Sequence, residues 1–472
     1  MIQIDDTLTP ASLRPALDRM WALSAGKIRA LDARYDARDG APVFTVDGRY
    51  TARGWTEWTQ GFQFGAALLQ FDATDERAFL DLGRARTRER MAPHVTHFGV
   101  HDHGFNNVST YGALRRLMLE GRTPHDDWEM AFYNMALVAS GAVQARRWTD
   151  LGTGEDGRPE GYVYSFNGPQ SLFVDTIRSM RSLALGHTLG GVLGGEHDAP
   201  VSLLARLAAH ARATCRYNVY YGEDRDGYDL RGRTVHEAIF NLNDGHFRCP
   251  STQQGYSPFT TWTRGLAWAM LGCAEQLEWL ATRPDTDFGG DPGGTGGRAD
   301  LEATLRRAAL ATCSFYLEHT PTDGVPYWDT GAPGLVRLGD YLARPADPYN
   351  DHEPVDSSAA AIAAQGLLRL GRYLGDADGA RYTQAGLTVL HTLLGEPYLS
   401  TDAAHEGLLL HAVYHWPNRW DHVPAGRRVA CGESCMWGDY HLREAALLAQ
   451  RLADSGPYYT FFGPPDARLP DA

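Results

Sequence analysis

Hydrophobic residues recur along most of the chain at the three-to-four-residue spacing of amphipathic helices. Stretches in which hydrophobic and polar residues alternate, as in half-buried strands, are scarce. The pattern therefore predicts a mainly α protein with about twelve helices. The predicted helices are Ser12 to Tyr35, Gly61 to Phe71, Glu76 to Met91, Tyr111 to Glu120, Asp126 to Trp148, Ser171 to His187, Val201 to Tyr217, Thr260 to Ala281, Leu301 to His319, Ser357 to Leu374, Gly379 to Leu394 and Gly438 to Leu452.

The predicted helices are of two kinds. Asp126 to Trp148 has mixed charged faces, as expected of an outer helix. Ser357 to Ala364 is rich in small residues and apolar all round, which predicts a buried helix that neighbours can approach closely. Six inner helices alternating with six outer ones would close into an (α/α)6 barrel, an all-α fold. The loops at the starts of the inner helices would then line a funnel.

One glycine-rich segment, Phe288 to Gly297, resembles a linker between domains. Helices of the same alternating kind lie on both sides of it. We therefore interpret it as a surface loop and predict a single (α/α)6-barrel catalytic domain over residues 1–472.

Composition excludes several classes of protein. With 43% hydrophobic and 22% charged residues, the chain can bury a large core. Its formal net charge is −14 and its only lysine is Lys27, so it lacks the basic footprint of a nucleic-acid-binding protein. An anionic ligand would be held by individual arginines rather than by the overall field.

The start of the chain, Met1 to Asp6, has neither the basic residues nor the apolar run of a signal peptide, and no apolar stretch approaches membrane-spanning length. We predict a cytoplasmic protein without membrane contact. The six cysteines have no paired C-x-x-C spacing, and the histidines at 94, 97, 101 and 103 match no standard zinc motif, so we predict neither a metal nor a cofactor. The sequence makes no prediction of oligomeric state.

Aromatic residues gather with polar or acidic residues at or near the predicted inner helix starts. Aromatic faces stack on sugar rings, and carboxylates, amides and arginines bind hydroxyl and acid groups. For any single aromatic, filling the core is the simpler interpretation, but the recurrence favours a carbohydrate pocket. The clusters are Trp55 to Trp58, His101 to Phe105, Tyr327 to Asp329, Asp356 to Ser358 and Trp437 to Tyr440.

Two aspartates are the candidate catalytic residues. Asp102 lies between His101 and His103 before a predicted helix, where a cap is the ordinary role. Asp175 lies in an apolar run that would bury it, and a buried carboxyl with raised proton affinity suits a general acid. Gln254, Arg264 and Trp268 are candidate binding residues, because a guanidinium can clamp a carboxylate while an indole stacks on its ring. Pairing of Arg264 with a structural acid is the alternative.

The order of these motifs resembles that of the unsaturated glucuronyl hydrolases of glycoside hydrolase family 88, over most of the chain. The shared motifs are Trp58-Thr59-Gln60-Gly61-Phe62, His101-Asp102-His103-Gly104-Phe105, the Asp175 segment, Gln254-Gly255-Tyr256-Ser257, Trp262-Thr263-Arg264-Gly265 with Ala267-Trp268, Asp356-Ser357-Ser358-Ala359-Ala360-Ala361, and Trp437-Gly438-Asp439-Tyr440.

The resemblance implies an (α/α)6 barrel that removes a Δ4,5-unsaturated uronic acid from the nonreducing end of oligosaccharides made by polysaccharide lyases. It implies that Asp175 protonates carbon 4 of the vinyl ether and activates water to attack carbon 5, with Asp102 as the partner carboxylate. By the same matching, Trp58, His236, Gln254, Arg264 and Trp268 contact the sugar.

Departures from the family pattern concern the substrate more than the reaction. His103 replaces an aliphatic residue, Gln63 stands where an aromatic is frequent, and Phe166 occupies roughly the place of a common tryptophan. Three alternatives stay open: an unsaturated rhamnogalacturonyl hydrolase, a sugar epimerase or isomerase using His187, His236 or His246, and a non-catalytic sugar-binding protein.

Overall fold

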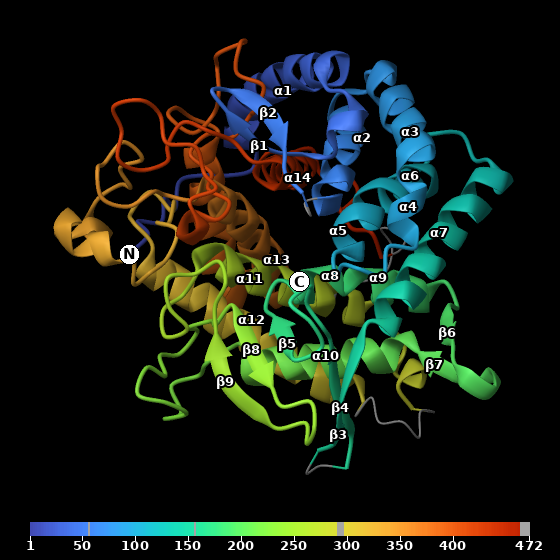
Figure 1. Cartoon of the computed structure of the whole chain (residues 1–472). Helices are drawn as coiled ribbons and strands as arrows, with labels where there is room; N and C mark the ends of the chain where they lie inside the picture. Colours follow the sequence, from blue (N-terminus) through green and yellow to red (C-terminus); the bar gives the residue numbers. More distant parts are fainter. Residues whose placement is uncertain (55–56, 155–156, 290–296, 463–472) are drawn as a thin grey trace.

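Two concentric rings of helices make up most of the protein (Figure 1). The computed structural model describes residues 1–54, 57–154, 157–289 and 297–462. Within these ranges the inner ring comprises α2 (Gln60–Thr74), α5 (His103–Asn107) with α6 (Ala113–Leu119), α8 (Thr176–Ser179) with α9 (Arg181–Thr188), α11 (Thr263–Ala281), the first half of α13 (Ser357–Leu393) and α14 (Met436–Ala453). The outer ring comprises α1 (Arg14–Arg34), α3 (Arg77–Arg90), α7 (Asp127–Arg146), α10 (Leu203–Tyr217), α12 (Arg298–His319) and the second half of α13.

The inner ring closes on itself. Each inner helix packs against the next one along the chain, and α14 packs against both α13 and α2. The predicted (α/α)6 barrel is thereby confirmed. A short α4 (Ala92–Val95) lies between α3 and α5, outside this alternation.

The structure differs from the predicted helices at Gly375 and at Ser171 to Phe173, for identifiable reasons. The predicted helices Ser357 to Leu374 and Gly379 to Leu394 are the two halves of α13, which breaks where Gly375 adopts a φ of 77°. The predicted helix Ser171 to His187 is wrong at its start, because Ser171–Phe173 forms strand β5. A short apolar run fits a buried strand as well as a helix, so spacing alone does not separate the two.

Short antiparallel strands fill the connections between helices. Hairpins are formed by β1 (Pro42–Val46) with β2 (Arg49–Ala52), by β3 (Trp148–Thr153) with β4 (Pro159–Val163), and by β6 (Val192–Gly194) with β7 (Pro200–Ser202). A three-stranded sheet has the order β5, β8 (Glu237–Phe240), β9 (Phe247–Ser251). The predicted surface loop at Phe288 to Gly297 lies largely outside the described residues.

Glycines line the seams of the inner ring. A Cβ on Gly104 of α5 would lie 2.3 Å from the Ser179 carbonyl oxygen on α8, and one on Gly272 of α11 would lie 2.7 Å from Ile177 Cγ2. Such distances leave no room for even a methyl group, so these helices approach as closely as their backbones allow. Gly61 and Gly65 of α2 have the same feature, and a Cβ on Gly366 of α13 or Gly438 of α14 would be nearly as tight, at 3.0 Å from its nearest neighbour.

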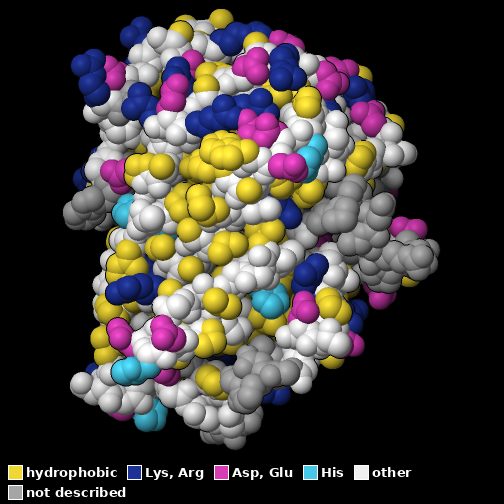
Figure 2. Space-filling view, turned by 90° about the vertical axis from the view of Figure 1, so that its right-hand side faces the viewer, with side chains coloured by type: hydrophobic (Ala, Val, Ile, Leu, Met, Phe, Trp, Pro, Cys, Tyr) yellow, Lys and Arg dark blue, Asp and Glu magenta, His cyan; other side chains and the backbone are white. Residues whose placement is uncertain are grey.

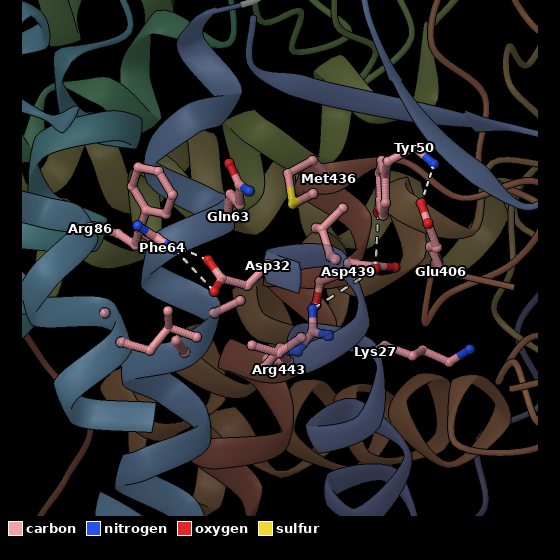
Figure 3. Close-up of a pocket in the computed structure, with 16 residues that line it drawn as sticks. Lys27, Asp32, Tyr50, Gln63, Phe64, Arg86, Glu406, Met436, Asp439 and Arg443 are labelled. Carbon is pink, nitrogen blue, oxygen red and sulfur yellow. Dashed lines mark hydrogen bonds and ion pairs between the residues drawn. The ribbon is translucent and has the colours of Figure 1, made fainter. Parts of the chain in front are cut away.

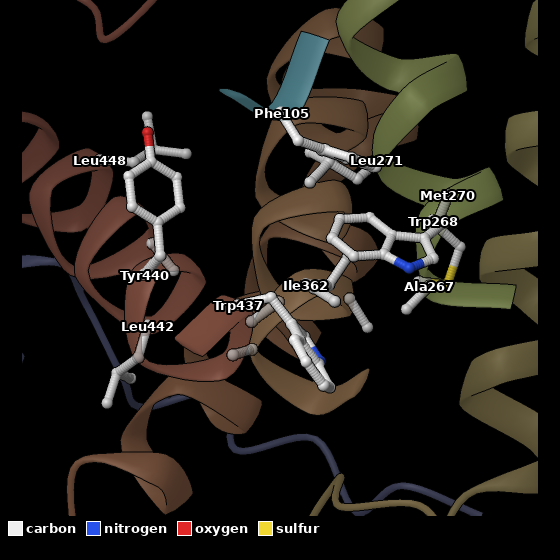
Figure 4. Close-up of a cluster of buried hydrophobic side chains, with 14 of the residues drawn as sticks. Phe105, Ala267, Trp268, Met270, Leu271, Ile362, Trp437, Tyr440, Leu442 and Leu448 are labelled. Carbon is white, nitrogen blue, oxygen red and sulfur yellow. The ribbon is translucent and has the colours of Figure 1, made fainter. Parts of the chain in front are cut away.

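The interior of the barrel has an aromatic layer near the starts of the inner helices. Figure 4 shows Phe105, Trp268 and Trp437 converging from α5, α11 and α14. The ring centroids of Phe105 and Trp268 are 4.9 Å apart. This layer is the floor on which any cavity at that end of the barrel rests.

Further into the barrel, arginines and glutamates form a fully buried network. Arg178 lies 2.8 Å from Glu275 and 3.0 Å from Glu444, and Arg369 lies 2.6 Å from Glu278. Tyr459, from the segment after α14, donates a hydrogen bond to Glu444. Together with Arg181, the network holds three arginines and three glutamates, so their formal charges balance. These buried side chains fill the barrel below the aromatic layer.

The outer surface carries apolar side chains on one face. Figure 2 shows hydrophobic groups gathered between charged ones on the side of the molecule that carries α7. Trp128 and Met135 of that helix are exposed. No helix in the described part of the chain is both long and apolar enough to cross a membrane.

Candidate active site

A cavity of about 520 Å³ opens above the aromatic layer. It lies at the starts of the inner helices, where the sequence predicts a funnel. Of the seven candidate site residues, six line it and His236 lies directly behind its wall. The lining is Gly54, Glu57, Trp58, His97, Gly99, Val100, His101, Asp102, Phe105, Phe166, Asp175, Gln253, Gln254, Trp262, Arg264, Trp268, Tyr414, His415, Asn418 and Trp420.

Both candidate carboxylates occupy the residue before a helix, yet neither caps it. Asp102 precedes α5 and Asp175 precedes α8, and neither side chain accepts a capping hydrogen bond. Pairing of β5 with β8 positions Asp175, because the Val174 amide donates to the His236 carbonyl just beyond the last strand pair. The ordinary capping role predicted for Asp102 is therefore absent, and both carboxylates are left to face the cavity.

His101 stands between the two carboxylates. Its Nε2 lies 3.7 Å from Asp102 Oδ1 and 3.6 Å from Asp175 Oδ1. The ring is buried, and neither of its nitrogens has a hydrogen-bond partner among the described residues. Burial opposes the charged imidazolium, but the two carboxylates outweigh burial and raise the pKa of His101.

The two carboxyl groups differ in proton affinity. Burial raises the pKa of Asp102, and neighbouring His101 offsets only part of this effect. Burial acts on Asp175 in the same direction, but His101, His236 and Arg264 together outweigh it and lower the pKa of Asp175. The sequence-based expectation of a raised proton affinity at Asp175 thus does not fit the site without substrate, in which Asp102 holds a proton more readily.

His236 supports the site from behind. Its Nδ1 accepts a hydrogen bond from the Gln253 amide at 3.0 Å, which leaves the proton of the neutral ring on Nε2. That Nε2 is buried and has no partner among the described residues. Burial lowers the pKa of His236 to about 4, so this ring is neutral near pH 7.

Arg264 is anchored within the protein. Its Nη1 lies 2.8 Å from Asp356 Oδ2, and its Nη2 donates to Gln254 Oε1 at 2.9 Å and to the Tyr414 carbonyl. The pairing with a structural acid that the sequence left open is present. Arg264 still lines the cavity, where it supplies positive charge and holds Gln254 in place.

Tryptophans form the apolar walls of the cavity. Trp58 stacks on Trp437 with centroids 5.1 Å apart, and Trp268 lies one helical turn after Arg264 on α11. Residues 55 and 56 of the first aromatic cluster lie outside the described residues.

A wall segment at Tyr414, His415, Asn418 and Trp420 was not predicted. The aromatic-rich run His415 to Trp420 could have indicated a cavity wall. This run belongs to a loop that is far along the chain from the predicted helix starts, so it was not included among the clusters.

Two acids of the predicted clusters lie away from the cavity. Figure 3 shows Asp439 with Tyr50 and Arg443 beside a separate small pocket between α1, α2 and α14. Asp439 accepts hydrogen bonds from Tyr50 Oη and from the Leu408 amide, so it anchors loops. Asp329 accepts from the Tyr256 amide and likewise is not part of the cavity lining.

Comparison with known proteins gives relatives along nearly the whole chain. The unsaturated glucuronyl hydrolase of Bacillus sp. (strain GL1) is 26% identical over 442 residues, which cover 92% of this chain and 97% of that protein. The unsaturated chondroitin disaccharide hydrolase of Streptococcus pyogenes serotype M1 is 24% identical, with 96% of this chain and 95% of that protein covered. No family model matches the chain.

Solved structures of unsaturated glucuronyl hydrolases share the fold. One that is specific for heparin has a TM-score of 0.68 at 17% identity, over 93% of this chain and 98% of that one. Another, described with dGlcA-Glc-Rha-Glc, has a TM-score of 0.65 at 24% identity, over 93% and 97%. These matches agree with the barrel, and the curated relatives confirm the resemblance that the motifs indicate.

Proposed function

We propose that this protein, a relative of the unsaturated glucuronyl hydrolases along nearly all of its sequence, is a glycoside hydrolase that removes a Δ4,5-unsaturated uronic acid from the nonreducing end of an oligosaccharide. The observation that carries the proposal is the pair of buried carboxylates, Asp102 and Asp175, joined through His101 at the base of a tryptophan-walled cavity. Relatives named for unsaturated glucuronyl and chondroitin disaccharide substrates support it.

The proposed reaction is hydration of the vinyl ether double bond. A proton passes from the carboxyl group of Asp175 to carbon 4, and the resulting carboxylate accepts a proton from the water that attacks carbon 5. The hemiketal then opens and releases the remaining saccharide. Proton donation to carbon requires an acid held close to it, and the positive charge that develops on the ring favours a nearby anion, which Asp102 can supply because His101 favours its ionised form.

The substrate itself adjusts the proton affinity of the site. In the site without substrate, the pKa of Asp175 is lowered mainly by His101. The uronic acid brings a carboxylate of its own, and a negative charge near Asp175 favours its protonated form. Binding of an anionic sugar thus favours the state that donation to carbon 4 requires, whereas a neutral sugar would not.

The alternative enzymes fit less well. A sugar epimerase would move protons with histidines that titrate near neutral pH, but burial lowers the pKa of His236 to about 4. His187 and His246 are not among the residues that line the cavity. An unsaturated rhamnogalacturonyl hydrolase uses the same hydration chemistry and remains the alternative substrate class. The cytoplasmic location and the single-domain organisation stay predictions.

The test is the ultraviolet absorbance of the conjugated double bond in lyase-generated disaccharides. We expect the wild-type protein to abolish this absorbance and Asp175→Asn to slow its loss by about 10²–10⁴-fold, the range typical of general acid–base catalysis. Asp244→Asn, which changes an exposed carboxylate outside the cavity, is the matched control and should retain the wild-type rate. Persistence of the absorbance with glucuronyl, galacturonyl and rhamnogalacturonyl substrates would rule out the proposed function.

A further inference from the structure

Three potential metal ligands meet outside the candidate active site. Within the described part of the chain, Asp47, His422 and Glu433 each offer one ligand atom, and these atoms all lie within 4.8 Å of one another. None of the three lines the cavity of the candidate active site. They come from three separate segments: the tip of the β1–β2 hairpin, the loop after Trp420, and the residues just before α14.

The hairpin sets the backbone conformation of Asp47 and anchors the side chain of Glu433. Asp47 and Gly48 form the two-residue turn between β1 and β2, with φ values of 49° and 75°. Glu433 Oε2 accepts hydrogen bonds from Thr45 Oγ1 and from the Gly48 amide. The same oxygen lies 3.7 Å from His405 Nε2, so the contacts found for Glu433 within the described residues all involve Oε2 and leave Oε1 for a further ligand.

His422 supplies a nitrogen without a hydrogen-bond partner. Its Nε2 is buried and lies 3.2 Å from Asp47 Oδ1, but the geometry of this contact does not make a hydrogen bond with any described residue. A buried imidazole nitrogen that faces a carboxylate without completing a hydrogen bond is an arrangement that a shared cation would satisfy.

The ligand chemistry selects among cations. One imidazole nitrogen and two carboxylate oxygens carry two negative charges, which a divalent ion balances. Mg²⁺ and Ca²⁺ prefer ligand sets made only of oxygen, whereas imidazole suits Zn²⁺ and its neighbours in the transition series. Asp47 is 85% exposed, so water can complete the coordination at that side. We propose that Asp47, His422 and Glu433 form a binding site for Zn²⁺.

A zinc ion here would join the hairpin to a wall of the cavity. The loop that bears His422 also carries His415, Asn418 and Trp420, which line the candidate active site. The contact between Asp47 and His422 joins that loop to the tip of the hairpin. Bound zinc would add coordination bonds to Asp47, His422 and Glu433, and so tie the loop to the hairpin and to the residues before α14. These bonds would stabilise the wall of the cavity that this loop forms. This inference does not depend on the proposed reaction.

Isothermal titration of the tag-free, chelator-treated full chain with ZnCl₂ tests the proposal. We expect one Zn²⁺ per chain, with Mg²⁺ and Ca²⁺ at least tenfold weaker. His422→Gln should weaken zinc binding at least tenfold. Asp47→Asn should also weaken it, and asparagine accepts the positive φ at this exposed turn, so folding is preserved. His246→Gln is the matched control, because His246 lies 3.2 Å from Asp244 without a third ligand.

Replacing Zn²⁺ by Co²⁺ allows metal binding to be followed by visible absorption, independently of the calorimetric titration. The visible absorption band of protein-bound Co²⁺ should appear with the wild type and with His246→Gln and be lost in His422→Gln. The proposal is overturned if the wild type takes up no zinc, if His422→Gln and Asp47→Asn bind it as tightly as the wild type, or if Mg²⁺ binds equally well.

Discussion

A single buried histidine sets the relation between the two candidate catalytic carboxylates. His101 contacts both Asp102 and Asp175, and no described hydrogen bond fixes its ring nitrogens. The two carboxylates therefore raise the pKa of His101, and protonated His101 in turn opposes the rise that burial causes in the pKa of both carboxylates. His101 favours the ionised form of both carboxylates, so it makes each a weaker base.

Replacing His101 should move the pH profile in a defined direction. In His101→Gln the pKa values of Asp102 and Asp175 both rise, because the cation that lowers them is gone. The site then keeps its proton to higher pH, so we expect the alkaline limb of kcat/KM to shift upward. His187→Gln, which removes a partly exposed histidine 3.6 Å from Asp287, should leave the limb in place. An alkaline limb that stays in place or moves downward in His101→Gln would contradict the role of His101 as the cation that lowers both carboxyl pKa values.

At this scale the sequence predicted which residues share a cavity better than it predicted their proton affinities. Asp102, Asp175, Trp58, Gln254, Arg264 and Trp268 were predicted, and all six line one cavity. The order of the two pKa values was not, because it depends on the position of His101 relative to both carboxylates. A run of apolar residues indicates burial of Asp175 but says nothing of the cations that face it.

The start of α13 links a helix cap to Arg264 in the lining of the cavity. Asp356 Oδ1 accepts hydrogen bonds from the amides of Ser358 and Ala359, while Oδ2 pairs with Arg264. One fully buried carboxylate therefore both begins an inner helix and neutralises a buried guanidinium that lines the cavity.

Asp356→Ala should therefore cost far more than the loss of a cap. Leaving Arg264 buried without its partner is expected to lower the free energy of unfolding by about 3–5 kcal/mol, measured by urea denaturation. Asp126→Ala removes the exposed cap of outer helix α7, where the side chain accepts only from the Glu129 amide, and should cost about 1 kcal/mol. Equal losses in the two variants would show that the Arg264 pair contributes little.

The sequence predicted the boundaries of those helices in which the apolar periodicity extends over many turns. Helices such as α1, α11 and α14 show many turns of apolar repetition, so their positions follow from the sequence. Strand β5 did not, because its three residues owe their conformation to pairing with β8, which lies more than 60 residues later. Partners at that distance leave no signal in the local pattern.

For the whole molecule, the tight glycine seams make the ring sensitive to single methyl groups. We expect Gly272→Ala to lower the free energy of unfolding by about 1–3 kcal/mol, because its Cβ would lie 2.7 Å from Ile177 Cγ2 and 2.8 Å from the Arg178 amide. Gly26→Ala, in outer helix α1 with no atom within 4 Å of the new Cβ, should be neutral or stabilising. Thermal unfolding of the two variants tests this, and a stable Gly272→Ala would refute the role of the seam.

The overall architecture was predictable because alternation of helix types is a pattern of the whole sequence. Small, apolar helices such as Ser357 to Leu374 predict an inner ring, and charged-faced ones such as Asp126 to Trp148 predict an outer ring. The wall segment at Tyr414 to Trp420 was not predicted. The position of a loop depends on the elements that it connects, and its sequence has no periodic pattern of apolar residues that would indicate this position.

The buried arginine–glutamate network gives the barrel a blind end. Its six charged side chains are almost completely buried and Tyr459 donates a hydrogen bond to Glu444 from below, so a sugar has no route through the described part of the axis. Everything that enters the cavity must leave by the same opening. The saccharide at the opening would leave before the uronic acid held beneath it, so product release would be ordered, and the uronic acid, which leaves last, should be the product that inhibits competitively with the substrate.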